Sequence, residues 1–201
     1  MANVDAAFGY RPVGKVGSGV NNGGTTLYTI GDNYATSIFK GDHVMQASGL
    51  VIAGTASGAT NLGVFNGCFY IDPTSAKPTW SNYYPADTNV TNTGSISGTT
   101  TIDAYIYDDP YYLFVAQCDG TIAKTDIGKN TDSVLGTSST VNGLSVTEID
   151  SGSEATTAGL QVKIIGITKD PENDDASSAN ANWHIMWNEH VKFSSTGITG
   201  T

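Results

Sequence analysis

The sequence predicts an all-β protein, a small antiparallel barrel or sandwich of short strands. Several segments alternate apolar and polar residues with a period of two, which is typical of half-buried strands. Glycine, serine, threonine and asparagine separate these segments at short intervals, and 24 of the 201 residues are glycine. No helical stripe, heptad or fixed-length repeat is visible. Short strands at regular spacing are typical of barrels and sandwiches.

The clearest strand pattern lies in the most apolar segment, residues 101–130. Residues 102–107 alternate isoleucine and alanine with aspartate and tyrosine, and Asp108-Asp109-Pro110 ends this strand because proline cannot donate to a ladder. The continuously apolar run from Tyr112 to Ala116 predicts a second, more deeply buried strand that ends at Cys118. Residues 121–130 have moderate strand propensity. We therefore expect a strand-turn-strand core.

Residues 1–24 are expected to form an extended amino-terminal arm. Phe8, Tyr10 and Val13 would be its apolar anchors, and Arg11 is its lone arginine. The glycines that follow disfavour an independent core element, because each glycine loses much conformational entropy when it becomes ordered. We expect the arm to become ordered on a partner.

Residues 25–193 are expected to form a single β domain, and residues 194–201 a flexible tail. Residues 25–40 divide at Gly31-Asp32-Asn33 into two short strands, which predicts a hairpin. The remaining expected strands are short apolar runs between turn residues: 43–45, 50–53, 62–71, 144–149, 160–168 and 183–193.

The connection formed by residues 72–99 is too long for an ordinary turn and contains three prolines. Long connections in compact domains are often binding loops. Its aromatic residues Trp80, Tyr83 and Tyr84 would form a large apolar patch on a monomer, so we expect a second copy or another protein to cover them.

Composition argues against several classes of function. The net charge of −10, with no cluster of lysine or arginine, would repel a phosphate backbone, so no nucleic-acid partner is expected. The chain has no basic region followed by an apolar run at its start, and no apolar stretch approaches about 20 residues, so neither a signal peptide nor a membrane partner is expected.

The candidates for catalysis and metal binding are weak. His184 and His190 are six residues apart rather than four, and no nucleophile elbow is present. The acidic residues 170–175 fail the EF-hand pattern, so a solvated turn is favoured, although a different calcium site that includes Asp108, Asp109 or Asp119 stays open. No catalytic residue, metal site or cofactor is predicted.

Buried packing is the favoured role for four other residues. Cys68 and Cys118 lie in expected strands and are interpreted as buried free thiols rather than a disulfide. Trp183 and Trp187 are four residues apart, so they share one face of a strand, which favours a core or an interface.

Several segments spread over nearly the whole chain carry a resemblance to a known group of proteins. They are residues 2–12 (ANVDAAFGYRP), 62–70 (LGVFNGCFY), 81–86 (SNYYPA), 107–110 (YDDP) with Phe114, Gln117 and Asp119-Gly120, 126–130 (DIGKN), 170–173 (DPEN) and 188–190 (NEH). This pattern of turns and strands resembles virion structural proteins of tailed bacteriophages, especially phages of marine bacteria. At Ala7 the chain departs from the group, where proline is expected.

The resemblance implies a non-enzymatic decoration or cement protein that binds the outer surface of the capsid and is made in the bacterial host cytoplasm. Its expected partners are the major capsid protein and further copies of itself, as a trimer or dimer. The alternative is a carbohydrate-binding or host-attachment module that uses the Trp80–Tyr84 loop. The residues expected at a capsid or subunit interface are Phe8, Tyr10, Arg11, Val13, Trp80, Tyr83 and Tyr84.

Overall fold

The computed structural model describes residues 3–17, 19–20, 23–58, 60–88 and 101–193 of the chain. Over these ranges the protein is all-β, as predicted, and its antiparallel sheets pack as a sandwich. The helical structure described is limited to one 3-10 turn, η1 (Lys124–Asp126). No barrel closes in the described part of the chain, so of the two expected architectures the sandwich is correct.

The first lobe is a five-stranded sheet in the order β1-β10-β15-β14-β11, with the pair β12-β13 beside it. Its strands are β1 (Arg11–Lys15), β10 (Tyr112–Gln117), β11 (Asn130–Thr131), β12 (Ser133–Val134), β13 (Glu148–Ile149), β14 (Val162–Ile167) and β15 (Asn182–Trp187). In the centre of the sheet, Ile185 of β15 lies opposite Phe114 on one side and Ile164 on the other, and all three are buried. Alternate positions of these strands thus form one hydrophobic core.

The second lobe is a six-stranded sheet in the order β2-β9-β6-β4-β5, with β7 paired to β6 and the pair β3-β8 nearby. Its strands are β2 (Thr26–Gly31), β3 (Ile38–Phe39), β4 (His43–Ala47), β5 (Leu50–Ala53), β6 (Gly63–Ile71), β7 (Pro78–Ser81), β8 (Tyr83–Tyr84) and β9 (Thr101–Tyr107). Its separate core includes Ile102, Ala104 and Ile106 of β9. The sheet curls enough to bring β2 near β5, but no ladder joins these strands.

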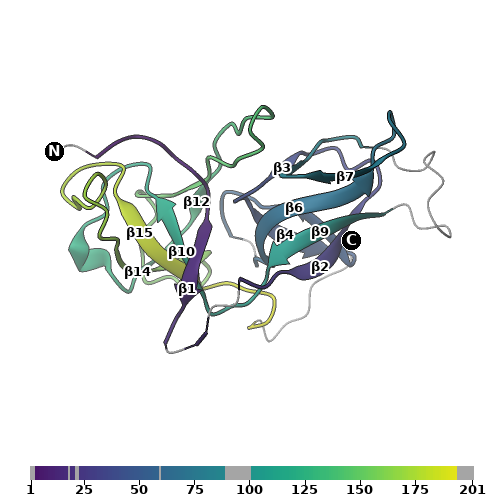
Figure 1. Cartoon of the computed structure of the whole chain (residues 1–201). Coiled ribbons are helices and arrows are strands. Elements are labelled where there is room, and N and C mark those ends of the chain that lie inside the picture. Colours follow the sequence, from purple (N-terminus) through teal and green to yellow (C-terminus); the bar gives the residue numbers. More distant parts are fainter. Residues whose placement is uncertain (1–2, 18, 21–22, 59, 89–100, 194–201) are drawn as a thin grey trace.

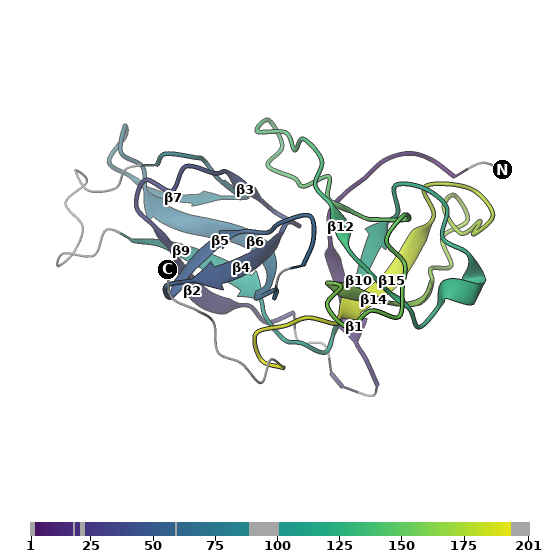
Figure 2. The ribbon, with the colours of Figure 1, turned by 180° about the vertical axis from the view of Figure 1, so that it is seen from behind.

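The second lobe is inserted into the first along the chain. β1 belongs to the first lobe, β2 to β9 build the second, and β10 to β15 complete the first, so the two lobes lie side by side (Figures 1 and 2). After β15 the chain returns to the second lobe, where His190 forms a bridge with Asn61.

Backbone hydrogen bonds connect the two lobes. The amide of Tyr10 donates to the carbonyl of Gly41 over 2.8 Å, and the amide of Lys40 donates to the carbonyl of Gly143 over 3.1 Å. The amide of Ser145 returns a 2.9 Å bond to the carbonyl of Lys40. Tyr10 also stacks on His43, with ring centroids 5.9 Å apart. The junction is therefore a continuous part of the fold.

The structure corrects two predicted strand arrangements. Residues 25–40 do not form a hairpin, because β2 pairs with β9 and β3 pairs with β8. Residues 101–130 do not form one core either, because β9 and β10 enter different sheets. Residues 121–130, which have moderate strand propensity, contain η1 and the first residue of β11. The central segment is instead the crossover between the lobes.

Other predicted strands are shorter in the structure than expected. Within residues 144–149 only Glu148–Ile149 is a strand, and the strand expected at 183–193 ends at Trp187. Residues 194–201, the predicted tail, lie outside the described residues.

The expected arm contains an edge strand of the first lobe. Residues 11–15 form β1, which pairs with β10 across a bulge between Pro12 and Gly14. The bulge accommodates a proline that lacks an amide donor and a glycine that has little strand propensity. Tyr10 is 1% exposed and belongs to the core of the first lobe. The boundary proposed at residue 24 therefore separates β1 from the sheet to which it is paired.

Candidate binding surface

The outer face of the six-stranded lobe carries exposed aromatic and aliphatic side chains. Cys68 and Ala104 lie opposite each other and point into the core, so their strand neighbours point outward. The outward side chains include Phe69, which is 37% exposed, and Trp80 of β7, which lies opposite Phe69 and is 50% exposed. Together with Tyr105 of β9 and Leu27 of β2 they form what we call the aromatic face.

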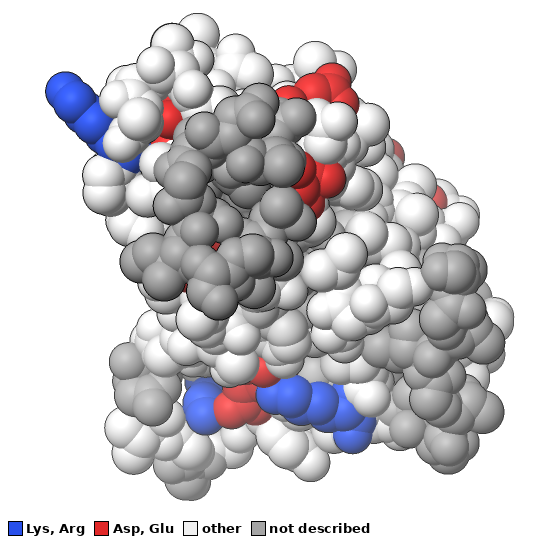
Figure 3. Space-filling view, turned by 90° about the vertical axis from the view of Figure 1, so that its right-hand side faces the viewer, with Lys and Arg blue, Asp and Glu red and all other residues white. Residues whose placement is uncertain are grey.

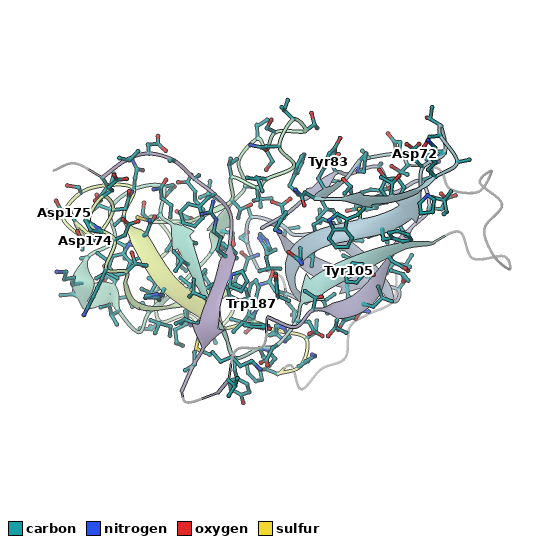
Figure 4. All side chains as sticks on the ribbon, viewed as in Figure 1. Asp72, Tyr83, Tyr105, Asp174, Asp175 and Trp187 are labelled. Carbon is teal, nitrogen blue, oxygen red and sulfur yellow. The ribbon has the colours of Figure 1, made fainter. Side chains whose placement is uncertain are left out.

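A glycine in β6 makes room for Trp80 on this face. Gly67 lies at a bulge with φ of +148°, and a Cβ atom there would come within 2.6 Å of the Trp80 ring. The ring therefore lies over the glycine backbone and contacts Tyr105, with centroids 5.0 Å apart and planes inclined by 57°. Figure 4 shows Tyr105 and Tyr83 on the six-stranded lobe and Trp187 on the other lobe.

The predicted loop residues have three different environments. The expected connection 72–99 contains β7 and β8, and its residues 89–100 lie outside the described ranges. Trp80 is half-exposed, as a binding residue would be, whereas Tyr84 is fully buried and donates its hydroxyl hydrogen to the carbonyl of Tyr34. Tyr83 is partly buried and stacks on Phe39, with centroids 5.4 Å apart. Tyr84 is therefore a core residue.

The predicted arm residues also divide between surface and core. Val13 is 48% exposed and Arg11 is exposed, with its guanidinium 4.2 Å from the centroid of the Phe8 ring. Tyr10 is buried and forms a 2.7 Å hydrogen bond with the hydroxyl of Ser133. Tyr10 belongs to the core of the first lobe and Tyr84 to the core of the second, so the seven predicted residues form two separate groups.

Charged residues are sparse on the side of the molecule shown in Figure 3. Apart from the grey residues, most of this surface is uncharged. Acidic and basic side chains adjoin in a band near its lower edge, and separate acidic patches and a basic side chain lie in its upper part. At the lobe junction Lys15 pairs with Asp109, and Lys192 pairs with Asp108. Burial opposes ionisation of Asp109, but its hydrogen bonds with Lys15 and the Tyr111 amide outweigh burial and lower its pKa.

Residues of the acidic segment 170–175 form hydrogen bonds with other residues of the chain. Asp175 accepts hydrogen bonds from the amide and hydroxyl of Ser177, and Asp170 accepts from the side-chain amide of Asn182. The side chain of Asn3 donates to the carbonyl of Asp175. These contacts tie the amino-terminal segment to the acidic turn.

The remaining chemistry-bearing groups are dispersed. Within the described ranges, no three histidine, cysteine, aspartate or glutamate side chains are grouped as a metal site requires. Cys68 and Cys118 are buried free thiols in different cores, and burial raises the pKa of Cys68 to about 12. In the same ranges no helix has the length and apolar character needed to cross a membrane.

Three members of the aromatic face were not predicted: Leu27, Phe69 and Tyr105. Tyr105 has a usable signal, since it alternates with Ile102, Ala104 and Ile106 and therefore faces away from them. Leu27 and Phe69 give no such signal, because their exposure depends on which strands pair.

No protein-family model, curated protein or solved structure matches this chain.

Proposed function

We propose that the chain is a non-enzymatic decoration or cement protein of a tailed-phage head, which binds the outer surface of the capsid lattice and stabilises it. The aromatic face is the observation that carries this proposal. Isolated exposed apolar residues are ordinary on monomers, but adjoining ones that include a half-exposed tryptophan indicate a surface that another protein covers. The resemblance of several segments to phage virion proteins supplies the class of partner.

Interface burial is the proposed mechanism. Tryptophan and tyrosine bury about 150–250 Å² each and are enriched at the energetic centres of interfaces. Trp80 is held against Tyr105 and over Gly67 before any partner arrives, so its ordering costs little on binding. The net charge of −10 is unfavourable beside packaged DNA, which supports an outward position on the head.

The proposal includes self-association on the lattice, as a trimer or dimer, beside contacts with the major capsid protein. Closed symmetric arrangements are the commonest among homo-oligomers. The expected location is the outer capsid surface of the virion, after synthesis in the host cytoplasm.

Co-sedimentation with undecorated heads tests the proposal. Trp80→Ala should weaken head binding about thirtyfold, which corresponds to about 2 kcal/mol, while circular dichroism and the melting temperature change little. Val141→Ala is the matched control, because Val141 is 95% exposed and lies outside the aromatic face. Head binding by a folded Trp80→Ala protein at the wild-type level would contradict the proposal.

A carbohydrate-binding or host-attachment module is the second candidate, and the half-exposed Trp80 ring favours it because sugars stack on such rings. Glycan binding that is lost in Trp80→Ala, with tens rather than hundreds of copies per virion, would select this candidate. Hundreds of copies per virion and no glycan binding would select the decoration protein.

A further inference from the structure

A small pocket lies between the two lobes, beside β1. Its volume is about 130 Å³, and both lobes contribute to its wall. The apolar part of the wall comes from Tyr10 and Pro12 of the first lobe and from Val64, Phe65 and Tyr107 of the second. An apolar cavity of about 150 Å³ can hold a benzene molecule, so this pocket has room for a branched aliphatic side chain.

Two cationic residues, Arg11 and Lys40, also line the pocket. The chain has only nine lysine and arginine residues against 19 acidic ones, so two cations at one small pocket are notable. Within the described part of the chain, the ion pairs involve Lys15, Lys129 and Lys192, and neither Arg11 nor Lys40 takes part. The Arg11 guanidinium lies over the ring of Phe8, which also lines the pocket, so no ion pair within these ranges neutralises either cation.

A third polar residue, Asn66, follows Phe65 in β6 and lines the same pocket. Its Oδ1 atom is buried and has no hydrogen-bond donor among the described residues. A buried acceptor without a donor is costly, and a ligand with an N–H group would remove that cost.

We propose that this pocket binds a short peptide segment of a partner protein in which a branched aliphatic residue carries or adjoins a carboxylate. The aliphatic side chain fills the cavity lined by Tyr10, Val64 and Tyr107. The carboxylate accepts hydrogen bonds from Arg11 and Lys40, and the backbone N–H of the segment donates to Asn66. A bare phosphate or sulfate would match the cations alone and leave the apolar wall and the amide oxygen unused.

The inference deepens the proposed function and rests on it for the identity of the partner, a capsid protein. Because the two walls belong to different lobes, a bound segment would contact both and stabilise their junction.

Titration of the full-length protein with N-acetyl-L-leucine, followed by amide NMR shifts, tests the pocket. This probe has the N–H group, the carboxylate and the isobutyl side chain, and we expect saturable shifts at Asn66 and Lys40 in the millimolar range. N-acetyl-L-leucinamide, which lacks the carboxylate, should bind about tenfold more weakly. Equal affinities of the wild type for the two probes, or no saturable binding of N-acetyl-L-leucine, would overturn the inference.

The double variant Arg11→Gln/Lys40→Gln should lower the affinity for N-acetyl-L-leucine about tenfold. The control Lys77→Gln/Lys169→Gln removes the same charge from two exposed lysines outside the pocket and should bind as the wild type does. If the control loses as much affinity as the pocket variant, the effect is one of net charge and the inference is wrong.

Head co-sedimentation separates this inference from the proposed function. If the wild type binds the probe with the expected dependence on charge but does not bind heads, the pocket stands and the proposed function fails. If the wild type binds heads but not the probe, the proposed function stands and the pocket inference fails.

Discussion

The ammonium group of Lys192 lies 2.8 Å from the carboxylate of Asp108. This ion pair joins the segment after β15 to the crossover between β9 and β10. The same carboxylate accepts 2.7 Å hydrogen bonds from the hydroxyls of Thr26 and Tyr28. Burial opposes ionisation of Asp108, which is 6% exposed, but the three donors outweigh it and lower its pKa. One carboxylate thus connects three chain segments at the lobe junction.

Asp108→Asn should lower the free energy of unfolding by about 2–3 kcal/mol, because the amide cannot serve three donors and leaves a lysine and a tyrosine hydroxyl without their partner. Urea unfolding at pH 7 measures the change. Asp174→Asn, at an exposed position outside the ion pairs of the described residues, is the control and should change stability by less than about 0.5 kcal/mol. Equal midpoints for Asp108→Asn and the wild type would show that the junction does not depend on this carboxylate.

Acid should weaken the fold through His190, which is 1% exposed at the junction. Burial lowers its pKa from 6.5 to about 4. The hydrogen bond with the Leu62 backbone and the charges of Asp108 and Asp109 oppose this shift, and the charge of Lys192 adds to it. Between these two values the unfolded chain binds a proton that the folded chain does not. The free energy of unfolding therefore falls as pH is lowered from about 6.5 to 4, by no more than about 3 kcal/mol.

Urea midpoints measured from pH 7 to pH 4 in the wild type and in His190→Gln check this effect. The variant should lose less stability across that range than the wild type, and identical pH profiles would exclude His190 as the cause. The contribution of Asp108, whose pKa is lowered, is lost below this window, because the free carboxyl titrates near 3.8. Burial also lowers the pKa of His43, so some acid sensitivity should remain in the variant.

Sequence periodicity predicted the positions of the strands better than it predicted which strands pair with each other. The alternation of Ile102, Ala104 and Ile106 correctly predicted β9, and the apolar run from Tyr112 correctly predicted β10. Both strands follow one another closely in the sequence, yet they belong to different sheets. Local pattern indicates which face of a strand is buried, but it does not specify the distant strand that covers that face.

The candidate site shows the same limit at the level of single residues. An exposed Trp80 was predictable from its position between turns and prolines, whereas Tyr84 in the same segment is core. The two differ because Tyr84 pairs with Ile38 and reaches the carbonyl of Tyr34, both far away in the sequence. Composition identified the aromatic group, and long-range pairing decided which of its members remained on the surface.

Gly9→Ala should destabilise the junction. Gly9 has φ of +72°, and an added Cβ atom would lie 2.6 Å from Cβ of Ser145 and 2.9 Å from the carbonyl oxygen of Gly41. Backbone strain and overpacking together should lower the free energy of unfolding by about 2–4 kcal/mol. Gly14→Ala is the matched control, because an added Cβ there meets nothing within 4 Å. Thermal unfolding that ranks the two variants equally would contradict the close approach at Gly9.

The last prediction concerns Tyr10, the residue through which the amino-terminal segment enters the fold. Its ring is 1% exposed, lies 6.0 Å from the ring of Trp187 in the first lobe and stacks on His43 in the second. Tyr10→Ala should therefore cost about 3–5 kcal/mol, whereas Tyr10→Phe should cost about 1 kcal/mol through loss of the bond to Ser133. Val13→Ala, at a half-exposed position of β1, should change stability little.

Deletion of residues 1–24 tests the same contacts on a larger scale. An arm that became ordered only on a partner could be removed with little change in melting temperature. The structure predicts the opposite, because the deletion removes both Tyr10 and the edge strand that covers β10. The truncated protein should lose much of its near-ultraviolet circular dichroism and cooperative melting. A truncated protein that melts like the full chain would show that β1 and Tyr10 are dispensable, and the arm would then be free to act on a partner alone.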